Sequence, residues 1–141
     1  MAFYPYLNFD GNCREAFTRY QEIFGGELTV LPMSDMPGAA DLPPEQAGRT
    51  MHAALKFEGH LLMASDAPPG DFTPMQGMFV NCSVAEVTEA ERVFAALAEG
   101  GQVIMPLEET FWSPRFGMCV DRFGTPWMVD AEPAEGSQVQ G

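Results

Sequence analysis

Apolar residues recur along this chain first at the spacing of a strand and then at the spacing of a helix, and the two patterns occur twice in that order. In the first half Leu7 and Phe9 alternate with polar residues, and the apolar positions after them lie three and four residues apart. Each helical pattern ends at a glycine pair, Gly25-Gly26 and then Gly100-Gly101. The pairs are 75 residues apart (100 − 25 = 75), which indicates that one supersecondary unit is used twice.

Both helical stretches are predicted to be amphipathic. Their apolar faces consist of Cys13, Ala16, Phe17, Tyr20, Ile23 and Phe24 in the first half, and of Val87, Ala90, Val93, Phe94 and Leu97 in the second. The first helix is expected to begin at a capping box formed by Asn12 and Glu15, and to end at Gly25. Each helix should therefore pack against a sheet.

Three strand-like runs follow each helix. They cover residues 27–33, 51–57 and 61–65 in the first half, and residues 103–107, 115–121 and 126–131 in the second. The chain is therefore predicted to be α+β, with two tandem βαβββ modules at residues 1–66 and 77–131. A proline-rich linker at 67–76 and a disordered tail at 132–141 complete the expected organisation of one domain.

The strongly negative net charge makes some classes of binding partner unfavourable. With 7 Lys and Arg against 20 Asp and Glu, the net charge is −13, which repels nucleic acid and anionic membrane surfaces. The sequence has no long apolar run for a membrane span and no secretory signal pattern, so a cytoplasmic location is expected. The 3 cysteines contain no Cys-x-x-Cys pair, which argues against a disulfide framework and a zinc knuckle.

Several segments together resemble a known family. They are YLNFDGNCREAF at residues 6–17, LMASD at 62–66, WSPRFGM at 112–118 and FGTPWM at 123–128. They are similar to the PhnB-like branch of the glyoxalase, bleomycin resistance and extradiol dioxygenase superfamily, whose members are also called vicinal oxygen chelate (VOC) proteins. The resemblance implies two modules whose mixed sheets curl around a cleft with the helices outside, and commonly a homodimer. The methyltransferase label carried by some members is discounted, because each glycine pair closes a helix instead of opening one.

The resemblance also implies where a metal would bind, since metal-using relatives take ligands from the first and last strands of each module. Strand alternation and the repeat offsets place Tyr4, Met63, Phe79 and Met128 at those positions, facing the cleft. Phenol, thioether and phenyl groups are poor ligands for divalent cations, so neither a metal site nor a cofactor is expected. A register slip bringing Asp130 and Ser65 inward is the alternative that would leave one carboxylate there.

Other side chains are candidates for contact with a ligand. His52 could act as a general base or donate a hydrogen bond, or be a strand-edge histidine bonded to backbone or water. Arg115 is the second catalytic candidate, with Trp112 stacking on a planar ligand; alternatively Arg115 pairs with a surface acid and Trp112 covers a sheet edge. Tyr6 is expected to face the cleft with Tyr4, and Cys119, which shares the strand parity of Arg115, is expected to face it as well.

Two classes of function follow from these residues. The first is a metal-free protein that binds a small apolar or cationic organic molecule in its cleft. The second is an enzyme of lyase, isomerase or dioxygenase type, either metal-dependent or using His52 as its acid-base group with Arg115 as an oxyanion partner. The expected partners are a small-molecule ligand and a second copy of the chain, without nucleic acid or membrane.

Overall fold

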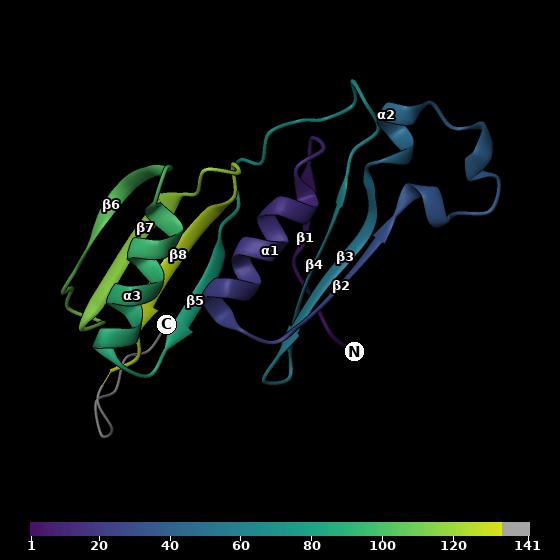
Figure 1. Ribbon diagram of the computed structural model, residues 1–141. Helices are drawn as coiled ribbons and strands as arrows, with labels where there is room; N and C mark the ends of the chain where they lie inside the picture. Colours follow the sequence, from purple (N-terminus) through teal and green to yellow (C-terminus); the bar gives the residue numbers. More distant parts are fainter. Residues whose placement is uncertain (134–141) are drawn as a thin grey trace. The chain divides into compact units, whose positions relative to one another are not determined.

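The chain forms two compact units, Met1–Pro74 and Met75–Gly141, and the computed structural model describes residues 1–133. Each unit contains one four-stranded mixed sheet with a helix on one face (Figure 1). The predicted α+β class with two βαβββ modules is confirmed. The tail predicted at 132–141 lies almost entirely outside the described residues. No helix in residues 1–133 is long and apolar enough to cross a membrane.

The first unit has the strand order β1-β4-β3-β2. Its elements are β1 (Tyr6–Phe9), α1 (Cys13–Phe24), β2 (Glu27–Pro32), β3 (Thr50–Phe57) and β4 (His60–Asp66). Strand β1 pairs with β4 in parallel, and the other neighbours are antiparallel. Between β2 and β3 the chain forms the short helices η1 (Met33–Asp35), η2 (Ala39–Asp41) and α2 (Pro44–Ala47).

The second unit repeats this topology in the order β5-β8-β7-β6. Its elements are β5 (Val80–Val84), α3 (Val87–Ala98), β6 (Gln102–Glu108), β7 (Arg115–Val120) and β8 (Pro126–Ala131). The register matches that of the first unit: Tyr6 pairs with Met63, and the residues 75 and 65 positions later, Asn81 and Met128, pair in the same way. The duplication predicted from the glycine pairs therefore extends to individual strand partners.

Each helix buries its apolar face against one side of its own sheet. In the first unit Phe9 packs edge-on against Phe17 and lies with Leu55 under α1; in the second Trp127 and Val129 are covered by α3. The predicted alternation holds along β4, where every second residue from Leu62 to Asp66 is buried. It also holds in β3 from Ala53 to Leu55 and in β8 from Trp127 to Ala131, whereas Pro126 at the start of β8 is buried beside Trp127. Each sheet thus has one covered face and one face without a helix of its own unit, called here the open face.

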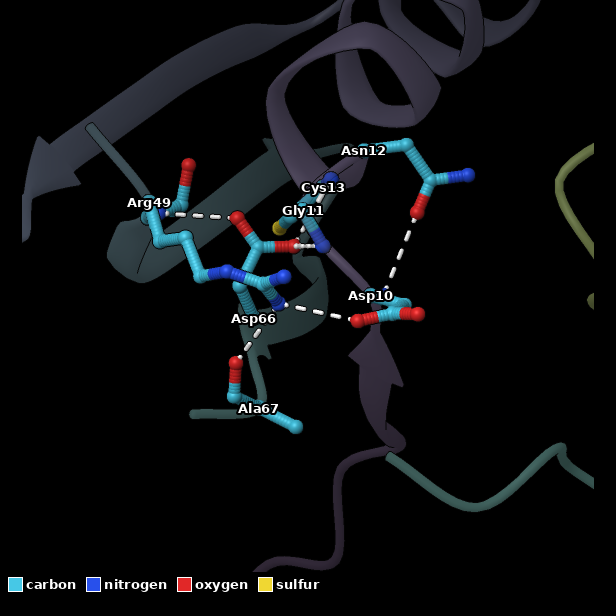
Figure 2. A network of polar contacts seen from close by, with 8 residues as sticks. Asp10, Gly11, Asn12, Cys13, Arg49, Asp66 and Ala67 are labelled. Carbon is cyan, nitrogen blue, oxygen red and sulfur yellow. Dashed lines mark hydrogen bonds and ion pairs between the residues drawn. The ribbon is translucent and has the colours of Figure 1, made fainter. Parts of the chain in front are cut away.

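The predicted capping box at the start of α1 does not form. Asn12 makes no side-chain bond to the helix amides; its Oδ1 accepts instead from the Asp10 amide. The start of α1 is capped instead by Asp66 at the end of β4, whose Oδ1 accepts from the amides of Gly11 and Cys13 at 2.8 and 3.0 Å (Figure 2). The second oxygen, Oδ2, accepts from the amide of Thr50 at 2.8 Å. A carboxylate at a helix N-terminus also opposes the helix dipole favourably.

The second glycine of each pair sits where a side chain has no room. A Cβ added to Gly26 would lie 2.5 Å from the Lys56 carbonyl oxygen, and one added to Gly101 would collide with the Val120 carbonyl. Both glycines lie between a helix and the next strand, β2 or β6, and pass close to the backbone at the end of β3 or β7. The repeated Gly-Gly motif is therefore explained by close backbone approach at the second position.

Candidate functional site

The open face of the first sheet gathers the polar and apolar candidates of that unit. Pairing places Tyr6, Met63, Ala54 and Thr29 side by side across the four strands, because directly paired residues point to the same face. The next row along contains Asn8 with Ser65, and His52 with Leu31. Met63 is half-buried, whereas Tyr6 is 50% exposed.

Tyr6 and His52 form a pair on this face although they are 46 residues apart. The Tyr6 hydroxyl lies 3.2 Å from Nδ1 of His52, and their ring centroids are 5.8 Å apart. If Nδ1 carries no proton, the hydroxyl donates to it and the Nε2–H is left to donate to a ligand; in the other tautomer the hydroxyl accepts from Nδ1. The pair can therefore present a donor or an acceptor to a bound molecule.

The open face of the second sheet carries sulfur, aromatic and carboxylate groups. One row contains Asn81, Met128, Met118 and Met105. The neighbouring row contains Ser83, Asp130, Phe116 and Glu108. Thioethers deform easily, so the methionine row is an adaptable apolar surface beside an acidic one.

The four ligand-equivalent positions are placed in two different ways. Met63 and Met128 lie on the open faces, half-buried, as expected from strand alternation. Tyr4 and Phe79 precede β1 and β5 and are exposed, so the first residues of those strands on the open faces are Tyr6 and Asn81. Residues 1–133 contain no group of three His, Cys, Asp or Glu side chains that could hold a metal ion.

Asp130 reaches the open face without any register slip. It lies two residues after Met128 on β8, and a strand has a period of two, so both side chains point the same way. The same relation holds for Ser65 and Met63 on β4. Alternation alone therefore predicts a carboxylate on this face, and the slip assumed in the sequence interpretation was unnecessary.

Arg115 and Cys119 lie on the covered face of the second sheet, where α3 packs. Arg115 pairs with Ala131 in register, and its Nε is 3.6 Å from Oε1 of Glu91 on α3. Cys119 has the parity expected, but it pairs with Trp127 and is 0% exposed. Burial, with a smaller contribution from Asp121, raises the pKa of the Cys119 thiol to about 11. The structure therefore places both away from the open face, unlike the expectation for Cys119.

Trp112 belongs to a cluster of three aromatic rings beside β7. Its ring centroid lies 4.7 Å from that of Phe111 and 5.3 Å from that of Phe116, both in edge-to-face geometry. Phe116 is the member on the open face, and sequence reasoning did not select it. Its signal was its alternation with Arg115 and Gly117.

Comparison with known proteins relates nearly all of the chain to one family. The model of the family described as 3-demethylubiquinone-9 3-methyltransferase matches residues 1–130. Protein YjdN of Escherichia coli is 33% identical, covering 98% of this chain and 100% of that protein. Protein PA1353 of Pseudomonas aeruginosa has a solved structure with 46% identity and a TM-score of 0.86, covering 94% of this chain and 98% of that one.

Two more distant solved structures share the fold. A putative 3-demethylubiquinone-9 3-methyltransferase, PhnB protein, from Bacillus cereus has 24% identity and a TM-score of 0.76, covering 93% of this chain and 99% of that one. A glyoxalase/bleomycin resistance protein/dioxygenase family enzyme from Burkholderia phytofirmans has 12% identity and a TM-score of 0.62, covering 92% and 97%. The two-module topology is thus that of the VOC fold.

Proposed function

Since the chain belongs to the family described as 3-demethylubiquinone-9 3-methyltransferase, a PhnB-like branch of the glyoxalase (VOC) superfamily, we propose that it binds a small organic molecule, apolar or cationic, without a metal ion. The observation that carries this proposal is the Tyr6–His52 pair on the open face of the first sheet. A polar pair beside the apolar side chains of Met63 and Leu31 is the usual composition of a ligand site, in which apolar walls supply affinity and few polar groups set orientation.

The side chains on the open faces support a metal-free site. Met63 and Met128 occupy the last-strand positions, and Tyr6 and Asn81 the first-strand positions that pair with them. Thioether, phenol and amide groups do not make a competitive site for zinc, nickel, manganese or iron, which prefer imidazole, carboxylate or thiolate. Asp130 and Glu108 are two carboxylates on the second sheet, and residues 1–133 contain no group of three His, Cys, Asp or Glu side chains that could hold a metal ion.

Methyl transfer, which the family description names, has little support from this chain. Both glycine pairs follow helices, as the sequence indicated, and therefore cannot form a phosphate-type glycine loop at a helix start. Gly11 does lie between β1 and α1, but its amide and that of Cys13 already donate to the Asp66 carboxylate. The N-terminus of α1 is thus occupied by a group of the protein itself.

The Tyr6–His52 pair also supports a second candidate, an isomerase or lyase that moves a proton without a metal. Imidazole is the side chain best suited to proton transfer near neutral pH, and the Tyr6 hydroxyl at Nδ1 holds the ring while Nε2 is left for a substrate in either tautomer. Arg115 does not join this pair in the proposal, because it is directed to Glu91 on the covered face of the other unit. His52 with Tyr6 would then carry the acid-base chemistry.

Ligand affinity in matched variants tests the proposal. A compound found by thermal-shift screening is titrated calorimetrically against the wild type, Tyr6→Phe, His52→Gln and His60→Gln. Loss of a charge-neutral ligand hydrogen bond predicts about tenfold weaker binding for His52→Gln and Tyr6→Phe. His60, an exposed residue at the start of β4, is the control and should leave affinity unchanged. Equal affinity in all four proteins would contradict the assignment of this face.

Incubation of the same compound with the wild type separates the two candidates. Proton NMR monitors the compound during the incubation, and a compound that stays unchanged supports the binding function. If the wild type converts the compound and His52→Gln does not, the protein is an acid-base catalyst and not a binding protein.

A further inference from the structure

We propose that the open face of the second sheet is a binding site for an alkylated ammonium group, formed by Asp130, Phe116 and Glu108 with Trp112 at its border. The inference goes beyond the proposed function, because it assigns a site with its own ligand charge to the second sheet, whereas the Tyr6–His52 pair lies on the first. It concerns residues of the second unit only.

The register puts an aromatic ring between two carboxylates. Phe116 on β7 pairs directly with Asp130 on β8 and with Glu108 on β6, so the three side chains share the open face. Neighbouring strands lie about 4.8 Å apart, which leaves each carboxylate one strand away from the ring. Phe116 and Asp130 are half-buried and Glu108 is exposed, so the row is accessible to a small molecule.

Hydrogen bonds hold the carboxylate of Asp130 in place. Ser83 Oγ donates to Asp130 Oδ1 at 2.8 Å, and Asn81 Nδ2 lies 3.2 Å from Ser83 Oγ, where it donates in turn. Within residues 1–133 no Arg, Lys or His forms an ion pair with Asp130 or with Glu108. The negative charge of the row is therefore not neutralised by the described part of the chain.

The loop between β6 and β7 fixes the aromatic border. Ser113 is buried, and its Oγ lies 2.6 Å from the carbonyl oxygens of both Arg115 and Ala131, to either of which its one proton can be donated. Thr110 and Ser113 are also bonded to each other across the turn. Because Trp112 precedes Ser113, this anchor holds the loop that places the indole against Phe116, the strand partner of Asp130.

A ring face beside carboxylates selects for one kind of cation. An alkylated ammonium group is weakly hydrated, gains cation–π attraction over an aromatic ring and is neutralised by a nearby carboxylate. A small inorganic cation keeps its water more tightly and would need several oxygen ligands, and the described residues contain no cluster of three acidic or metal-binding side chains. The methionine row, with Met118 and Met128, lies beside the site and can contact the apolar remainder of the ligand.

Titration with choline, compared with its neutral isostere 3,3-dimethylbutanol, tests the inference. Amide and indole signals of isotope-labelled wild-type protein are followed by NMR. Choline is expected to shift the signals of Phe116, Asp130 and the Trp112 indole, and to bind about tenfold more tightly than the isostere. Asp130→Asn is expected to weaken choline binding about tenfold. Glu108→Gln is expected to weaken it as well, and this exposed position leaves the Ser83–Asp130 hydrogen bond unchanged.

Glu99→Gln is the control, because it removes one negative charge, as Asp130→Asn does, from another place in the second unit, the end of α3. It should leave choline binding unchanged, since the effect depends on the local carboxylates and not on the net charge of −13. Three results would overturn the inference: no choline shifts at these residues, equal affinity for the neutral isostere, or equal weakening by Glu99→Gln and Asp130→Asn. None of them depends on His52, whose variants test the proposed function separately.

Discussion

Replacement of Asp66 by alanine should destabilise the first unit more than any other single change at a polar residue there. The Asp66 side chain is 4% exposed and accepts three backbone N–H groups from two separate segments, at Gly11, Cys13 and Thr50. Those segments are the start of α1 and the start of β3, and Figure 2 shows one further side-chain link between their flanks, the exposed ion pair of Arg49 with Asp10.

The magnitude follows from the amides that lose their acceptor. The bonds from Cys13 and Thr50 are buried, and a buried N–H without a partner costs about 1–3 kcal/mol, whereas the part-buried Gly11 amide can turn to water. Loss of a negative charge at the N-terminus of α1 adds about 0.5 kcal/mol. Allowing for the relieved burial of the carboxylate, the expected loss is about 3 kcal/mol, a large share of the ~5–15 kcal/mol that stabilises a domain.

Hydrogen exchange measured by mass spectrometry suits this prediction, because both tryptophans, Trp112 and Trp127, lie in the second unit and their fluorescence would not report on the first. Amides of α1 and β3 should exchange about 100-fold faster in Asp66→Ala. Asp10→Ala is the matched control: Asp10 is exposed and forms an ion pair with Arg49 at 3.0 Å, so a change of less than about 1 kcal/mol is expected. Equal exchange in the two variants would refute the reasoning.

Two further predictions concern backbone room and burial. Gly26→Ala should lower the free energy of unfolding by more than about 2 kcal/mol, because the added Cβ would meet the Lys56 carbonyl. Gly25→Ala has open space around it and should lower it by about 1 kcal/mol, because of its positive φ alone. Similar denaturation midpoints for the two variants would contradict this. The pKa of the Cys119 thiol is raised from 9.0 to about 11, so the stability it contributes is complete below pH 9 and is lost as the pH rises through 11. Between pH 9 and 11 the wild type should therefore lose about 1.4 kcal/mol per pH unit more than Cys119→Ala in urea denaturation, since the raised pKa values of Cys82 and Cys13 act in both proteins. Parallel pH profiles of the two proteins would contradict the prediction.

Local patterns predicted the fold of this chain well. The period of two in the strands and of three to four in the helices gave the elements, because burial of one face imposes those periods directly on the sequence. The duplication then fixed which strands correspond, and the pairings of Tyr6 with Met63 and Asn81 with Met128 bear it out. The implied homodimer and the boundaries of the linker stay predictions.

Long-range contacts were not predictable in the same way. Asn12 occupies the right position for a cap, but the helix amides donate to Asp66, which lies 53 residues after Cys13. Asp66 reaches them because it stands at the end of β4, beside the start of α1. Parity grouped Cys119 with Arg115 correctly, yet parity alone does not say which face α3 covers. The Tyr6–His52 pair depends on β1 and β3 lying on either side of β4, an arrangement that no local pattern specifies.

Metal content and metal dependence of binding test the central claim most directly. Tag-free protein is analysed for transition metals, and the affinity of a screened ligand is measured before and after exhaustive treatment with a chelator. The account predicts no stoichiometric metal and the same affinity in both preparations. A metal bound at about one ion per chain, with binding lost on chelation and restored by that metal, would contradict it.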